Sequence, residues 1–172
     1  SSEFLIEMTA RYLNAIYCDP QRIKEWFDNG ALANSLPASG FAPKYRWETA
    51  TVAGQELTLY PFNKKSINKL YERLREDNNA SRGYERTPRM FLLHVLQEQL
   101  SHFFDGMNYA QWNFPSEACI CGPVLLTDAG QDSAIDGLTH LTEKERRRAK
   151  LLLQFWGNGT ANADDTTIGG VH

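Results

Sequence analysis

Two arginines beside an expected helix start are the residues best suited to bind an anion. In the segment Glu85–Arg89, Thr87 is a typical N-cap residue and Pro88 fits the first helical position. The unpaired backbone N–H groups of a helix start favour a negative charge, and Arg89 would add a planar, bidentate donor for phosphate. Arg86 and Arg89 are therefore the predicted phosphate-sensing residues. The alternative is that both are surface charges on a well-capped helix.

A second group of cations stands at the start of the last expected helix. It comprises Lys144, Arg146, Arg147, Arg148 and Lys150. Such a run can bind the phosphate backbone of a nucleic acid. Glu143 and Glu145 dilute its charge, and cations in a first helical turn oppose the helix dipole. The run is thus either a solvated helix face, which is the commoner case, or a nucleic-acid-binding surface.

Two groups of metal-ligating residue types fall short of a complete site. The first group is His94, Glu98 and His102, which recur every fourth residue on one predicted helix face. The sequence offers no clear fourth ligand for a metal ion there. In the second, one residue separates Cys119 from Cys121, whereas roughly two to four residues separate paired ligands in typical zinc sites. His140 is the only histidine between Cys121 and the terminal residue. We therefore predict no metal site and no cofactor on this chain.

The sequence contains no complete catalytic motif. No Ser-His-Asp or Cys-His arrangement has supporting context such as G-x-S-x-G. There is also no G-x-x-x-x-G-K-[ST] motif, and no apolar strand ends in an acidic pair that could hold magnesium. The chain is therefore expected not to be an enzyme on its own.

Composition and charge narrow the class of protein. The chain has 172 residues, of which 42% are hydrophobic, enough for one core or one core with a small satellite. Its formal charge of -3 provides no global positive field, so nucleic-acid binding would need a local patch.

An odd number of cysteines favours a reducing compartment, and no apolar run approaches the roughly 20 residues that span a bilayer. We expect a cytoplasmic protein with no membrane partner. The start at Ser1, without methionine, suits a piece of a longer polypeptide.

The N-terminal third should form a helical hairpin and then a β-hairpin. Apolar spacing predicts a helix over Phe4–Ile16 and a second one from Asp19-Pro20 to Asn29-Gly30. The second helix has an expected buried stripe of Ile23, Trp26 and Phe27. A loop should follow over 31–44, and alternation around Ala53-Gly54 predicts a β-hairpin between residues 45 and 62.

Three helices are expected in the remainder. Asn63 should cap the first, with Lys69 on its solvated face. The longest should run from Thr87 to about Phe104, and its predicted inward residues are Leu92, Leu93, Val95, Leu96, Leu100, Phe103 and Phe104. A capping box of Thr142 and Glu145 opens the last helix, which should reach Trp156.

These elements predict an α+β, mainly α fold, made of a helical hairpin, a small β-hairpin and a helical bundle. Residues 1–159 should form a single compact domain, with subdomains 1–62 and 63–159 as the alternative. Residues 160–172 contain only Ile168 and Val171 as large apolar residues, so a flexible tail is expected there.

Three segments together resemble the helical lid of an AAA+ or related P-loop ATPase. They are MTARYLNAIYCDPQRIKEWFDNG, LTLYPFNKKSINKLYERL and ERTPRMFLLHVLQEQL. The resemblance covers about residues 4–104 and is closest to the large prokaryotic ATPases of DNA modification and phage defence. In such lids a helix-start arginine senses the nucleotide γ-phosphate, and Arg89 would have that role here. ATP and magnesium would then be bound by a core domain upstream of this chain.

The preferred interpretation is a non-catalytic regulatory or interaction module of such an ATPase, whose partner is the core domain or another protein. One alternative is a nucleic-acid-binding module that contacts DNA through the cations of residues 144–150. The other alternative is a protein–protein interaction domain that uses Trp112 and Phe114 as exposed anchors.

Overall fold

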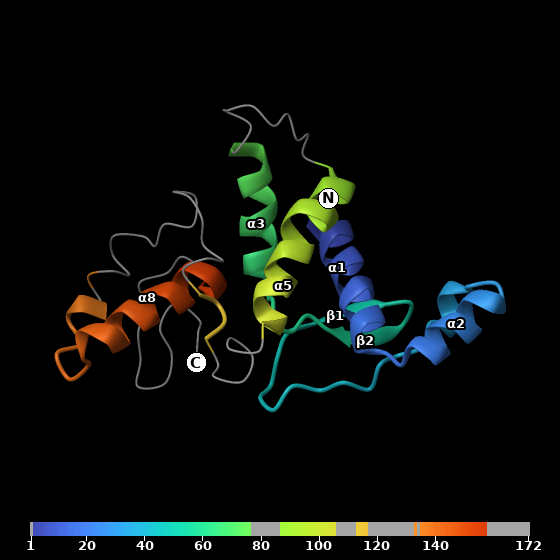
Figure 1. Cartoon of the computed structure of the whole chain (residues 1–172), viewed down its shortest axis with the longest axis horizontal. Coiled ribbons are helices and arrows are strands. Elements are labelled where there is room, and N and C mark those ends of the chain that lie inside the picture. Colours follow the sequence, from blue (N-terminus) through green and yellow to red (C-terminus); the bar gives the residue numbers. More distant parts are fainter. Residues whose placement is uncertain (1, 77–86, 106–112, 117–132, 134, 158–172) are drawn as a thin grey trace. The chain divides into compact units, whose positions relative to one another are not determined.

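The computed structural model describes residues 2–76, 87–105, 113–116, 133 and 135–157 (Figure 1). This part of the chain is mainly helical with one two-stranded antiparallel hairpin, which confirms the predicted α+β, mainly α class. The chain divides into two compact units, Ser1–Ile67 and Asn68–His172, and the division falls inside helix α3 (Lys64–Glu76). The expected tail over 160–172 lies outside the described residues.

The first unit begins with the expected pair of helices, α1 (Ser2–Tyr17) and α2 (Pro20–Asp28). Asp19 caps α2 by accepting a hydrogen bond from the backbone N–H of Gln21 at 2.9 Å, and Pro20 occupies the first helical position. Leu5, Ala10 and Leu13 form the buried side of α1.

The predicted buried stripe of α2 is wrong. No residue of α2 is buried, and the side chain of Phe27 is 73% exposed, while Ile23 and Trp26 are only partly covered. Helical spacing reports that one face is apolar, but only the placement of neighbouring elements decides whether that face is covered.

The β-hairpin pairs β1 (Thr49–Val52) with β2 (Gln55–Thr58), with Val52 opposite Gln55. Ala53 and Gly54 both have positive φ angles, 50° and 78°, as in the tight hairpin turn that matches the twist of the strands. Helix α1 packs against both strands, so that Ala50, Val52 and Leu57 are buried with its apolar side. This contact forms the core of the first unit.

Side-chain hydrogen bonds hold the long loop after α2, which contains one short 3-10 helix, η1 (Ala33–Ser35). The buried Asn14 donates to the carbonyl of Pro37 and accepts from the N–H of Ser39, both at 2.8 Å. Gln55 donates to the carbonyl of Leu36 at 2.7 Å. The loop is thereby tied to both α1 and β2.

Asn63 caps α3 as expected, since its side chain accepts a hydrogen bond from the N–H of Ser66 at 2.8 Å. In the second unit, α3 buries Leu70 and Leu74. Lys69 was predicted to be solvated, but its Nζ donates at 2.8 Å to each of the carbonyls of Gln154 and Gly157. The last carbonyls of a helix have no partner within the helix, so a lysine nearby satisfies them and favours the negative dipole end.

The predicted long helix is one helical run of three labelled parts: α4 (Pro88–Phe91), the π-helix η3 (Leu92–Leu96) and α5 (Gln97–Phe104). Thr87 caps it as expected by accepting from the N–H of Met90 at 3.2 Å. Leu93 and Phe104 were predicted to face inward, but both are exposed. A π turn adds a residue, which rotates the positions after it by about 100° relative to those before it.

Helix α8 (Glu143–Trp156) starts with the predicted capping box. Thr142 accepts from the N–H of Glu145 at 3.3 Å, and the Glu145 carboxylate accepts from the N–H of Thr142 at 2.7 Å. The second half of α8 buries Leu153 and Phe155. The core of the second unit also contains Phe91, Leu96, Leu100, Phe103 and Phe114.

Candidate functional site

Arg89 lies in the first turn of α4 and is exposed. The Tyr71 ring of α3 packs edge-on against Phe91, with 5.8 Å between ring centroids, and so holds this helix start in place. Within the described residues, the Arg89 side chain has no ion pair or hydrogen bond. Arg86, the other predicted phosphate-sensing residue, lies outside the described residues.

The backbone donors around Arg89 are mostly taken. Pro88 has no N–H, and the N–H groups of Met90 and Phe91 both donate to Thr87, to its hydroxyl and its carbonyl respectively. The N–H of Arg89 itself is the remaining donor of this turn that has no described partner. An anion at this position would therefore receive one backbone N–H and the guanidinium of the same residue.

The cations of α8 are largely used inside the second unit. Arg146 donates to the carbonyl of Leu141 at 2.6 Å. Arg148 donates to three successive carbonyls, that of Phe114 at 2.9 Å and those of Asn113 and Pro115. Lys150 forms an ion pair with Asp136 at 2.7 Å. Three of the five predicted nucleic-acid-binding residues therefore hold the loop and turn that precede α8.

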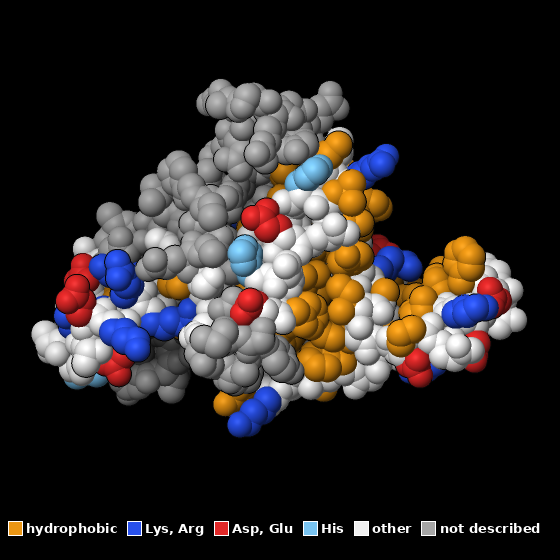
Figure 2. All heavy atoms as spheres, viewed as in Figure 1, with side chains coloured by type: hydrophobic (Ala, Val, Ile, Leu, Met, Phe, Trp, Pro, Cys, Tyr) orange, Lys and Arg blue, Asp and Glu red, His pale blue; other side chains and the backbone are white. Residues whose placement is uncertain are grey.

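The exposed cations of α8 are balanced by exposed carboxylates. Lys144 and Arg147 are exposed, as are Glu143 and Glu145, and Figure 2 shows Lys and Arg side chains mixed with acidic ones over α8. The backbone N–H and the hydroxyl of Thr142 lower the pKa of Glu145, so this carboxylate stays charged at neutral pH. The exposed part of the run has little net positive charge with which to attract a phosphate backbone.

The residue types that suggested a metal site are not brought together. His94 lies in η3, whereas Glu98 and His102 lie in α5, and the π turn breaks the simple four-residue periodicity between them. Over the described ranges, no group of three or more His, Cys, Asp or Glu side chains is close enough to hold a metal ion. Cys119 and Cys121 lie outside these ranges, and His140 is exposed.

Phe114 is not the exposed anchor that was predicted. It is only 5% exposed, because its ring packs edge-on against Phe103 and Phe155, with centroid distances of 5.3 and 5.2 Å. Arg148 also fixes its carbonyl. Aromatic rings in a segment without regular structure are as able to enter a core as to face a partner. Trp112, the second predicted anchor, lies outside the described residues.

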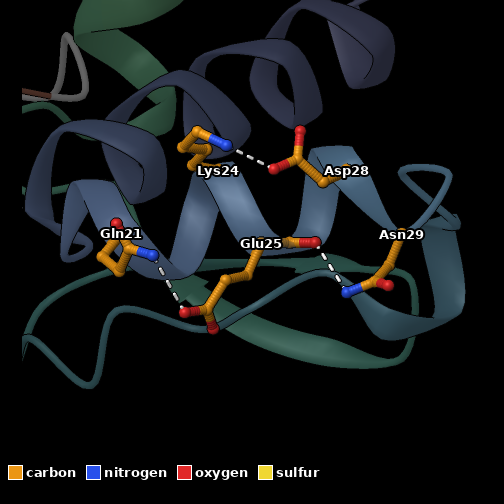
Figure 3. A network of polar contacts seen from close by, with 5 residues as sticks. All are labelled: Gln21, Lys24, Glu25, Asp28 and Asn29. Carbon is orange, nitrogen blue, oxygen red and sulfur yellow. Dashed lines mark hydrogen bonds and ion pairs between the residues drawn. The ribbon is translucent and has the colours of Figure 1, made fainter.

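Instead, two exposed large apolar side chains of the first unit lie on α2 and in the loop that follows it. Phe27 and Leu32 are exposed, and the Trp26 indole donates to the carbonyl of Leu32 at 2.9 Å, which brings the loop beside the helix. Figure 2 shows hydrophobic side chains at the surface over α2. The remaining surface of the helix is polar: Gln21 donates to Glu25 at 3.1 Å, and Lys24 pairs with Asp28 (Figure 3).

Comparison of the chain with protein-family models, curated proteins and solved structures found no significant match. The resemblance to ATPase lids therefore rests on the sequence segments alone. None of the helices in the described part of the chain has both the length and the apolar character needed to cross a membrane.

Proposed function

We propose that this chain is a non-catalytic regulatory or interaction module of a larger P-loop ATPase, in which Arg89 contacts the phosphates of a nucleotide bound to the core domain. The observation that carries the proposal is that Arg89 is exposed in a capped first turn, with no described partner for its guanidinium. A cation in a first turn opposes the helix dipole. A phosphate brought by another domain would turn this unfavourable charge into a favourable one.

The role suits an arginine because the negative charge on a transferred phosphoryl group is spread over its oxygens. A guanidinium offers two parallel N–H donors to such oxygens, and it remains charged at any physiological pH. Thr87 supports this role indirectly, since it satisfies the backbone of the turn and leaves the arginine side chain directed at no internal acceptor among the described residues.

The test is ATP hydrolysis by the complete polypeptide or complex to which the chain belongs. Arg89→Ala should lower kcat by about tenfold or more with little change in the affinity for ATP, and Arg89→Lys should retain part of the activity. Lys144→Ala is the matched control, since Lys144 is an exposed cation at the same position of another capped helix, α8. Full activity of Arg89→Ala, or the absence of any P-loop ATPase from the purified complex, would rule the proposal out.

A second candidate, a protein–protein interaction domain, gains support from the apolar side of α2. This nine-residue amphipathic helix has no buried residue, so its apolar stripe of Ile23, Trp26 and Phe27 is at most partly covered. On a helix, Arg22 and Lys24 border this stripe on its two sides, but Arg22 donates to the carbonyl of Ala38 and Lys24 pairs with Asp28. The complementary partner is an amphipathic helix whose apolar face covers this stripe.

Fluorescence of Trp26 and the other tryptophans would test this candidate. A designed amphipathic peptide with a leucine stripe should bind the chain more tightly than a peptide of the same composition whose leucines are scattered around the helix. Phe27→Asp should weaken binding at least tenfold, whereas Phe27→Leu should not. Equal binding of both peptides would contradict an apolar contact at this stripe. The nucleic-acid alternative at residues 144–150 gains no such support, because most of its cations have internal partners.

A further inference from the structure

Basic and aromatic residues alternate in the segment that leads into β1. Lys44, Tyr45, Arg46 and Trp47 are consecutive, and the first three are exposed. The Tyr45 side chain is 62% exposed, and the Lys44 ammonium lies 5.5 Å from the centroid of its ring. An exposed aromatic ring between two cations is the local pattern with which proteins hold a nucleotide base and its neighbouring phosphates.

Two hydrogen bonds join this segment to the start of α3. The Trp47 indole donates to the carbonyl of Phe62 at 2.5 Å, and the N–H of Lys64 donates to the Glu48 carboxylate at 2.7 Å. Lys64 and Lys65 are both exposed. These two hydrogen bonds thus bring together cations from two parts of the sequence, residues 44–46 and 64–65. We call Lys44, Tyr45, Arg46, Trp47, Lys64 and Lys65 the basic–aromatic surface.

The charges of this surface differ from those of α8. Within the described residues, the side chains of Arg46 and Lys65 have no ion pair or hydrogen bond. Two carboxylates have contacts in this region: Glu48 is bound to the start of α3, and Glu56 accepts hydrogen bonds from the hydroxyls of Thr49 and Thr51. Four cations therefore stand beside two carboxylates that already have hydrogen-bond partners, and the surface keeps a net positive charge.

Further aromatic rings pack next to Trp47. Trp47 packs edge-on against Tyr60, with 4.9 Å between ring centroids, and Phe41 stacks on Tyr17 at 4.1 Å. Tyr17 also donates to the carbonyl of Tyr60 at 2.8 Å. Trp47 and Phe41 remain partly exposed. Trp47 is held in a fixed position by these contacts, so little of its side-chain entropy would be lost when a flat ligand contacts it.

We propose that the basic–aromatic surface binds single-stranded nucleic acid, with Lys44, Arg46 and Lys65 on the phosphates and Tyr45 stacked on a base. A single strand is favoured over a duplex because its bases are free to stack on an aromatic ring. It is favoured over an acidic polypeptide because carboxylates would use the cations and leave Tyr45 without a role. The proposal does not depend on the ATPase function, since it concerns other residues.

Fluorescence anisotropy of the full chain with a labelled oligonucleotide of about 12 nucleotides, either oligo-dT or oligo-U, would test it. Binding should weaken steeply between about 50 and 200 mM salt. Arg46→Glu combined with Lys65→Glu should weaken binding at least tenfold at low salt. Tyr45→Ala should weaken it by about 5- to 100-fold, whereas Tyr45→Phe should retain it, since base stacking needs the ring and not the hydroxyl. Circular dichroism would verify that each variant is folded.

Arg147→Glu is the matched control, because it reverses an exposed cation on α8. It should leave the affinity unchanged. Four results would overturn the proposal: no binding at low salt, loss of binding with Arg147→Glu rather than with the surface variants, equal affinity for a duplex of the same length, or equal affinity for polyglutamate of the same charge. Each can occur whether or not Arg89 contributes to ATP hydrolysis.

Discussion

The cations of α8 and those of the basic–aromatic surface differ in what their side chains contact. The run in α8 is the denser one in sequence, yet Arg146, Arg148 and Lys150 are bound to carbonyls or to a carboxylate of their own unit. Arg46 and Lys65 lie far apart in sequence, and neither has such a partner in the described residues. The density of charge along a chain is thus a poor guide to the charge that a partner can reach.

The largest expected effect is the loss of stability when Arg148 is truncated. Arg148→Ala removes the donor of three backbone carbonyls beside the buried Phe114 and should lower the free energy of unfolding by about 2–3 kcal/mol. Arg46→Ala should change it by less than about 0.5 kcal/mol. Urea denaturation of both variants measures the difference. Equal stability would mean that the α8 cations are not structural and would remove the contrast.

Lys69 and Lys65 provide the same contrast within one helix. Lys69→Met keeps much of the aliphatic side chain but removes the ammonium that binds the last carbonyls of α8, and should lower the free energy of unfolding by about 1–2 kcal/mol. Lys65→Met should be nearly neutral, because Lys65 is exposed. Thermal unfolding followed by circular dichroism compares the two. A neutral Lys69→Met would mean that water replaces the ammonium without loss.

A smaller effect is expected for the ion pair of Lys150 with Asp136. The pair is partly exposed, so Lys150→Ala should lower the free energy of unfolding by only about 0.2–1 kcal/mol. Added salt should reduce the difference from the unmodified chain, whereas it should leave the Arg148→Ala difference largely intact. A salt-insensitive loss at Lys150 would indicate that this lysine acts through its packing instead.

The smallest effect concerns the charge of the basic–aromatic surface at low pH. The hydroxyls of Thr49 and Thr51 lower the pKa of Glu56 below its ordinary value of 4.5, and Lys64 lowers it further. Because the folded-state pKa is the lower one, the stabilisation is complete above pH 4.5 and is lost as pH falls through the folded-state pKa. Glu56→Gln should therefore flatten the pH dependence of the melting temperature below pH 4.5. An unchanged profile would show that Glu56 is not the titrating group.

Local signals in the sequence were sufficient for most of the secondary structure. Asp19-Pro20, Thr87-Pro88 and the Thr142 capping box each start a helix where expected. The hairpin turn also forms at Ala53-Gly54. These signals act over a few residues, through a cap or a turn conformation, and therefore can be read without knowledge of the rest of the fold.

The candidate sites were predicted less well, because they depend on residues far apart in sequence. Arg148 meets the carbonyls around Phe114, and Lys69 meets the end of α8, across segments that no periodicity connects. The basic–aromatic surface had a signal in the alternation of Lys44 to Trp47, but its second half comes from α3 through the contact of Glu48 with Lys64. The segments that resemble ATPase lids predict a phosphate-sensing role for Arg89, but they do not predict whether its side chain has a partner within the chain.

The sequence by itself determined the fold class, the helix starts and the hairpin turn, since these follow from local capping, spacing and backbone preference. Tertiary structure alone decided which apolar faces are covered, as the exposed Phe27 and the buried Phe114 illustrate. It also decided which cations are available to a partner. Burial and pairing are properties of two surfaces in contact, and one segment of sequence describes only one of them.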